Sequence, residues 1–281
     1  MLKKTLFVVL GMILAVSVCS PLLAANEPAA NTVIAVVKGD NITYGQIKIA
    51  EKDVIAAYEK SFGKKPAAAD IPRFKAQKEK IVLQSHIANL AIDKLIKEQN
   101  ITVKDEEIQA KESEMIKQYY GREDLADVVK VENEHWTALS RSLKDALKDP
   151  AKEKDIYNKN LTKLMSYDSW KMQLKHYNSL DKVALLDKSL PLTPESIRNS
   201  FYPRAKGELM DGKIKEYLAK NYPVTTAEIE KYASVNKKPL AVRDMDRLGE
   251  YLMMHKWMQD LVKKKDIQVK EASFKDTLGN L

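Results

Sequence analysis

The chain has 281 residues, of which 47 are Lys or Arg and 39 are Asp or Glu, so its formal net charge is +8. The basic residues are interspersed with acidic ones along the sequence, which favours a solvated surface of mixed charge and argues against a nucleic-acid partner. A surface with this net charge still permits transient contact with acidic polypeptides or anionic lipid headgroups.

The N-terminus predicts export. Two lysines precede an uncharged run that holds an apolar core and ends in Pro21 and alanine-rich residues. This pattern is typical of a secretory signal peptide, residues 1–25, with cleavage near Ala24 or Ala25. The alternative is an uncleaved membrane anchor, for which the run is barely long enough and which Pro21 interrupts. We therefore expect a periplasmic or otherwise extracytoplasmic protein.

Cleavage would also remove Cys19, the single cysteine of the chain. Lipid attachment to Cys19 is not expected, because Val16 and Val18 occupy the positions where a lipobox has leucine and a small residue. The mature chain then has no thiol, which excludes disulfides, thiolate metal sites and cysteine nucleophiles.

A hairpin followed by a capped helix is predicted near the start of the mature chain. Val33–Val37 is rich in β-branched residues, Lys38–Asn41 has turn residues, and Ile42 begins the return strand. Thr43 and Gln46 have the spacing of a capping box. The helix that this box opens carries apolar residues at helical spacing, namely Ile47, Val54, Ile55 and Tyr58.

The central stretch Lys75–Ile116 predicts two helices joined by a short strand. The first helix has apolar residues on two adjoining faces, a sector too wide for a surface helix, so other elements should cover most of it. These residues are Ile81, Leu83, Ile87, Ala88, Leu90, Ile92, Leu95 and Ile96. Ile101–Val103 alternates like a strand, and Asp105–Glu107 places three carboxylates in the first turn of the second helix, where the helix dipole favours them.

Two of these stretches resemble the SurA, PrsA and PpiD group of bacterial envelope chaperones. Residues 33–43, VIAVVKGDNIT, are similar to the start of the SurA-type domain, and residues 95–108 are similar to its helix, strand and acid-started helix. Lys104 departs from that pattern, because the family usually has Ser or Thr there as the helix cap. The resemblance implies a SurA-like chaperone domain formed by residues 32–120 together with residues 225–281.

Residues 121–224 are the expected helical insert domain. A parvulin-type prolyl isomerase domain with glycine-rich turns follows at this point in SurA and PrsA, but this segment holds only three glycines and no such motif. Thr193 and Pro194 predict the start of a helix, and Pro203 predicts its end. Apolar residues recur at spacings of three and four: Leu125, Val128, Val129, Trp136, Leu139, Leu143, Leu147, Tyr157, Leu161, Leu164, Tyr167, Trp170, Leu174 and Tyr177.

The C-terminal part predicts a capping box at Thr225–Glu228, a long final helix and a short strand, Ile267–Val269. Because such short strands are not stable alone, we expect this strand to join Val33–Val37 in one small sheet, while the final helix packs on the central helix around Ile87 and Leu90. The predicted fold class is mostly α: a SurA-like helical domain, a small sheet closed by the C-terminal helix and strand, and a helical insert.

The sequence contains no recognisable catalytic pattern. The four histidines lie far apart, and no HExxH pair, GxSxG turn, phosphate-binding loop or dinucleotide fingerprint occurs. We therefore expect no catalytic, cofactor-binding or metal-binding residues and no enzymatic activity.

The resemblance implies an ATP-independent chaperone that binds unfolded or nascent envelope polypeptides, including outer-membrane proteins. Met253, Met254 and Trp257 on the final helix are the candidate client-binding residues, because thioethers and amphipathic rings suit surfaces that accept many sequences. The simpler interpretation is that these side chains fill the core. Two other functions stay open: a foldase related to prolyl isomerases with an unusual insert, and an assembly adaptor with one envelope partner. The sequence predicts neither the client nor the oligomeric state.

Overall fold

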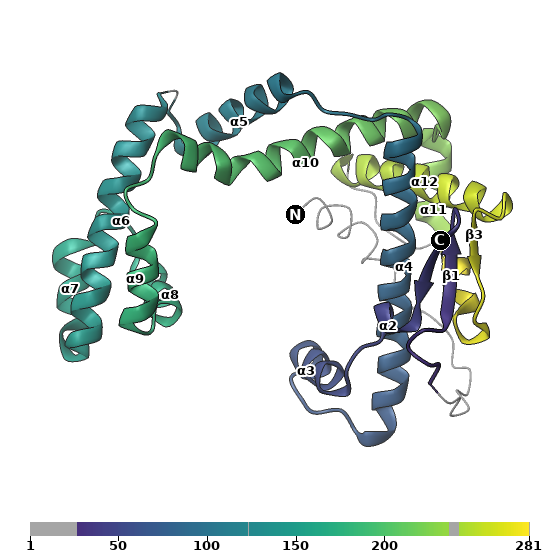
Figure 1. The fold of residues 1–281 in the computed structure, drawn as a ribbon, viewed down its shortest axis with the longest axis horizontal. Helices are drawn as coiled ribbons and strands as arrows, with labels where there is room; N and C mark the ends of the chain where they lie inside the picture. Colours follow the sequence, from purple (N-terminus) through teal and green to yellow (C-terminus); the bar gives the residue numbers. More distant parts are fainter. Residues whose placement is uncertain (1–26, 123, 236–241, 281) are drawn as a thin grey trace. The chain divides into compact units, whose positions relative to one another are not determined.

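The computed structural model describes residues 27–122, 124–235 and 242–280 (Figure 1). This part of the chain is mostly helical and has one three-stranded antiparallel sheet, which confirms the mostly-α prediction. The predicted signal peptide, residues 1–25, lies outside the described residues. No helix within them is long and apolar enough to cross a membrane.

The chain divides into two compact units, of which one is built from two separate segments of the sequence and the other from one continuous segment. Unit 1 combines the N-terminal part, up to Thr102, with the C-terminal part, from Met210 onward, and unit 2 is Val103–Leu209. The sequence predicts that the insert begins at residue 121 and ends at residue 224. The observed unit 2 begins at residue 103 and ends at residue 209, so both boundaries lie earlier in the chain than predicted. The second predicted helix of the central stretch consequently belongs to unit 2.

The sheet of unit 1 unites the two ends of the chain. Strand β1 (Val33–Val37) lies between β2 (Asp40–Thr43) and β3 (Ile267–Val269), and it is antiparallel to both. Lys38 and Gly39, which connect β1 to β2, have φ values of 46° and 87°, as a two-residue type I′ hairpin turn requires. The prediction that the first and last strands share one sheet is confirmed.

The N-terminal helices of unit 1 follow the hairpin. They are α2 (Tyr44–Ile47), α3 (Glu51–Phe62), the 3-10 helix η2 (Ala68–Asp70) and α4 (Ile71–Glu98). The Thr43 N–H donates to Gln46 Oε1 over 2.7 Å, so the predicted capping box is present. The single helix predicted after it is instead two, because Lys48 is extended and the Ile49 N–H donates to a side chain of α4.

Helix α4 is the centre of the core of unit 1. Its residues Leu83, Ile87, Ala91 and Leu95 are buried in one cluster with side chains from the sheet and from α12 (Val242–Lys263). Figure 1 shows the sheet beside α4. Other members of this cluster are Ile34, Val37, Ile42, Ile214, Leu218, Trp257, Met258, Leu261 and Ile267. The final helix and the central helix therefore share a core, as predicted.

Three further elements contribute to unit 1. Helix α10 (Pro194–Asn221) supplies its C-terminal part, from Met210, and is followed by α11 (Thr226–Val235) and, after β3, by the 3-10 helix η4 (Ala272–Asn280). The Thr225 N–H donates to Glu228 Oε2 over 2.8 Å, which confirms the second capping box. Lys256 on α12 pairs with Glu228 over 2.8 Å and so connects α11 to α12.

Unit 2 is helical throughout its described residues. Its elements are α5 (Asp105–Tyr120), α6 (Leu125–Lys148), the 3-10 helix η3 (Pro150–Lys152), α7 (Glu153–Asn160), α8 (Tyr167–His176), α9 (Leu180–Lys188) and the first part of α10. Helices α7 and α9 lie against α6 (Figure 1). One core cluster holds α6, α8 and α9 together around Leu143, Trp170 and Val183, and two smaller clusters join α5 to α10.

Two local predictions are wrong. Ile101–Val103 is not a strand in the structure. At the start of the helix that follows, the Lys104 N–H donates to Glu107 Oε2 over 2.7 Å. Pro203 lies inside α10 instead of ending it. Proline removes one intrahelical hydrogen bond, and the packing of Ala205 and its neighbours on both sides of that position is enough to keep the helix continuous.

Deletion of residues 242–281 should unfold unit 1, because it removes both β3 and the α12 side chains that cover α4. Burial of each large apolar side chain that the deletion exposes contributes about 1.5–3 kcal/mol to the free energy of unfolding. Thermal denaturation, monitored by circular dichroism, should show that the unfolding transition of unit 1 is absent or shifted to a much lower temperature. A truncated protein that melts like the full chain would contradict the closure of the fold by its C-terminal part.

Candidate functional site

The three predicted client-binding residues belong to the core of unit 1. Met254 and Trp257 are 9% and 3% exposed, and Met253 is partly buried against the same core. Met254 and Trp257 therefore follow the simpler interpretation, in which these side chains fill the core. Helix α12 is covered on more than one side, since Ile214 and Leu218 of α10 share its cluster and α11 packs along it. Met254 and Trp257 therefore offer no open surface to a client, and Met253 offers only part of its side chain.

Replacing Trp257 or Met254 by glutamine should accordingly destabilise unit 1. Trp257→Gln is a large-to-small change, which in a core costs roughly 2–5 kcal/mol. Met254→Gln keeps the side-chain volume, and its cost comes from burying an amide without a hydrogen-bond partner. Urea denaturation measures the change. Met172→Gln is the matched control, because Met172 is 69% exposed on α8 and its replacement should change stability by less than about 0.5 kcal/mol. Equal stability of the Trp257→Gln and Met172→Gln variants would contradict the core assignment.

Exposed large apolar side chains are concentrated in unit 2. Among the described residues, unit 1 exposes Phe62 and Val235. Unit 2 exposes Tyr119, Val131, Leu164, Met172, Leu180, Leu185 and Tyr202. Four of these, from Leu164 to Leu185, fall within or next to α8 and α9. Because single exposed apolar residues are common on any protein, the informative feature is their number in this short segment.

Three contacts with Glu153 hold α8, the helix that carries Met172, against α7. Trp170 Nε1 donates to Glu153 Oε1 over 2.6 Å, Tyr167 Oη donates to Glu153 Oε2 over 3.1 Å, and Lys171 pairs with the same carboxylate over 2.9 Å. Burial raises the pKa of Glu153, but the hydrogen bonds from Lys171, Trp170 and Tyr167 outweigh burial, and the pKa lies below its usual range. Glu153 is therefore ionised at neutral pH and joins α7 to α8.

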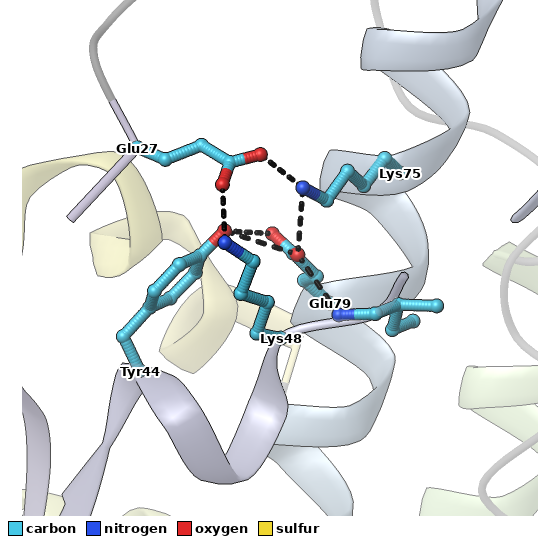
Figure 2. A network of polar contacts seen from close by, with 6 residues as sticks. Glu27, Tyr44, Lys48, Lys75 and Glu79 are labelled. Carbon is cyan, nitrogen blue, oxygen red and sulfur yellow. Dashed lines mark hydrogen bonds and ion pairs between the residues drawn. The ribbon is translucent and has the colours of Figure 1, made fainter. Parts of the chain in front are cut away.

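Figure 2 shows a network of polar contacts in unit 1, centred on the buried carboxylate of Glu79 on α4. Tyr44 Oη donates to Glu79 Oε1 over 3.1 Å, and the Ile49 N–H donates to the same oxygen over 3.2 Å. Lys75 Nζ lies 3.7 Å from it. Burial, reinforced by the negative charge of Glu79, raises the pKa of Tyr44 above its usual range, so the phenol stays protonated and donates.

Glu27 extends this network to the start of the described chain. It pairs with Lys75 and, over 2.8 Å, with Lys48 Nζ, and hydrogen bonds from these two lysines lower its pKa (Figure 2). Each carboxylate in the network thus has partners. The arrangement joins the N-terminal segment, α2 and the residues just before α3 to α4, and it leaves no carboxylate of the network free for a ligand.

Unit 2 has an open cleft of about 550 Å³ between α5 and the first part of α10. Its lining residues are Asp105, Gln109, Glu112, Glu195, Arg198, Asn199 and Tyr202. Glu112 is 5% exposed, whereas the other six are exposed. Within the described residues, Glu112 has no hydrogen bond and no ion pair.

The isolation of Glu112 follows from its position in the sequence. Ile108, Met115 and Ile116 are three or four residues away on α5 and are all buried, so Glu112 lies inside the apolar stripe of that helix. Burial raises the pKa of Glu112 above its usual range, and the positive charge of Arg198 offsets part of that rise. A carboxylate in an otherwise apolar helical stripe is a signal that the sequence analysis missed.

Glu112→Gln, which copies the shape of the protonated acid, should raise the melting temperature at pH 7 by about 2–4 °C, corresponding to roughly 1 kcal/mol. Below the ordinary carboxyl pKa of 4.5, Glu112 is protonated in both the folded and the unfolded chain, so its ionisation does not reduce the stability of the fold. As the pH rises above 4.5, ionisation is easier in the unfolded chain and the wild-type fold loses stability. The advantage of the variant should therefore disappear as the pH falls to 4.5.

Glu106→Gln is the control for this comparison, because Glu106 is exposed on the same helix. Melting curves between pH 4 and pH 8 measure both variants against the wild type. The same pH trend in the two variants would mean that burial of Glu112 is not its cause.

The described residues contain no group of three or more His, Cys, Asp or Glu side chains that could hold a metal ion. Comparisons with protein-family models, with curated proteins and with solved structures find no match to this chain. The resemblance to SurA-type chaperones consequently stays a prediction from the sequence.

Proposed function

We propose that this protein is an exported, ATP-independent chaperone that binds unfolded or partly folded envelope polypeptides. The observation that carries the proposal is the set of large apolar side chains that unit 2 exposes on well-packed helices, densest from Leu164 to Leu185. The resemblance of residues 33–43 and 95–108 to SurA-type chaperones supports it, and so does the signal-like sequence of residues 1–25.

Burial of apolar area would supply the binding energy. Each large side chain that a client covers fully contributes roughly 1.5–3 kcal/mol, offset by the entropy of ordering the client. Separate exposed residues such as Met172, Leu180 and Leu185 engage only a few client side chains at once, so the affinity should be weak, on the order of micromolar, and release should be spontaneous. Weak contacts with separate apolar residues also tolerate many client sequences, as a general chaperone requires.

The combined variant Met172→Gln, Leu180→Gln and Leu185→Gln should lose most of the ability to suppress aggregation of an unfolded substrate without ATP. These residues are 69%, 50% and 64% exposed, so the variant should keep the wild-type melting temperature. Light scattering of a chemically denatured substrate after dilution measures suppression. The matched control is Phe62→Gln with Val235→Gln, which removes the exposed large apolar side chains of unit 1 and should leave suppression intact.

Unchanged suppression by a folded triple variant would contradict the assignment of the client surface to unit 2. Absence of suppression by the wild-type protein would contradict the proposed function itself. A protease-coupled isomerisation assay on a proline peptide separates the chaperone from the isomerase-related foldase, because only the foldase accelerates isomerisation. Capture of many envelope polypeptides, rather than one, separates the chaperone from a dedicated adaptor.

A further inference from the structure

The cleft between α5 and α10 combines a buried, unpartnered acid with open access for a ligand. Glu112 lines the cleft, is 5% exposed, and has neither a hydrogen bond nor an ion pair within the part of the chain that the structure describes. Buried carboxylates in folded proteins are normally paired or hydrogen-bonded, because burial without a partner is costly. Glu79 in unit 1 follows this rule. The carboxylate oxygens of Glu112 have no protein partner within the described residues and are not fully buried, so they reach the open cleft.

The surrounding charges favour a cation. Asp105 and Glu195 line the same cleft with exposed carboxylates, and Arg198 is its one cationic lining residue. Arg198 makes no ion pair within the described residues, so it lies more than 4.0 Å from the Glu112 carboxylate. Three acids against one guanidinium make the cleft locally negative on a chain whose net charge is +8.

The spacing of the lining residues along α5 and along α10 places the side chains of each helix on the face that lines the cleft. On α5, Asp105, Gln109 and Glu112 are spaced by four and three residues and so share one face. On α10, Glu195, Arg198, Asn199 and Tyr202 follow the same spacing. The cleft thus offers a buried carboxylate at one point and, around it, carboxylates, amide groups and an aromatic ring that suit a cation attached to a peptide.

We propose that this cleft binds a basic side chain, the ammonium of lysine or the guanidinium of arginine, in a client polypeptide, with Glu112 as the buried counter-charge. The proposal deepens the proposed chaperone function, on which its choice of a peptide ligand rests. A metal ion is a poorer fit, because the acids of the cleft are not grouped as ligands of one ion. The bound cation would complete a charge-assisted hydrogen bond with Glu112 that the protein itself lacks.

The test uses the full chain and fluorescein-labelled nonapeptides of alanine, glycine and serine that differ at the central residue: arginine, lysine or glutamine. Fluorescence anisotropy should show that the wild-type protein binds the arginine or the lysine peptide at least tenfold more tightly than the glutamine peptide. Comparison of the two basic peptides identifies the preferred cation. Glu112→Gln should abolish the tenfold preference, and its melting curve shows whether the variant is folded.

Glu106→Gln is the matched control for this test, because it removes the same charge from the same helix outside the cleft and should keep the preference. Equal binding of all three peptides by the wild-type protein would overturn the proposal, and so would a preference that survives in the folded Glu112→Gln variant. An equal loss of the preference for basic peptides in both variants would also overturn the proposal, because the preference would then depend on the net charge of the protein and not on Glu112.

The same proteins in the aggregation assay separate this proposal from the proposed function. Suppression of aggregation without any preference for basic peptides would reject the cleft and leave the chaperone function in place. A preference that depends on Glu112, without suppression of aggregation, would support the cleft and reject the chaperone function.

Discussion

The antiparallel pairing of β1 with β3 determines how the whole chain is organised. Val37 of β1 pairs with Ile267 of β3, so residues 230 positions apart form one sheet. A strand as short as β3 has too few hydrogen bonds to stay in place alone, and the burial of α12 against α4 supplies the missing stability. Because both ends of the chain are needed for one core, the residues between them leave unit 1 at Thr102 and return to it at Met210.

The two buried glutamates of α4 and α5 illustrate how the surroundings of a side chain decide its role. Glu79 accepts hydrogen bonds from Tyr44 and from the Ile49 backbone and lies near Lys75, so its charge is compensated and it stabilises the fold. Glu112 is equally buried, but apolar side chains surround it on its own helix and it has no such donor within the described residues. A buried acid that the fold does not pair breaks a general rule of protein structure, and such exceptions are expected at functional sites.

Sequence alone determined the features of this protein that depend on neighbours within a few residues. The capping boxes at Thr43–Gln46 and Thr225–Glu228 and the acidic first turn of α5 appear where the sequence predicts them. The predicted hairpin turn is also present, but it is Lys38–Gly39, shorter than the predicted Lys38–Asn41. Hairpin turns and helix caps are made by local backbone and side-chain hydrogen bonds, so the residues that form them are sufficient to predict them. The wide apolar sector of α4 also predicted correctly that the helix is buried.

Tertiary structure decided the features that depend on contacts between distant segments. Met254 and Trp257 are buried because α10 and α11 cover a second side of α12, and nothing within α12 specifies that cover. Helix α10 continues through Pro203 because packing on either side outweighs one lost hydrogen bond. Glu112 faces a cleft without a partner because of the side chains that α10 places opposite α5, more than eighty residues later in the chain. An apolar stripe indicates which face of a helix is buried, but which distant segment covers that face, and whether it brings a polar partner, is decided only by the assembled fold.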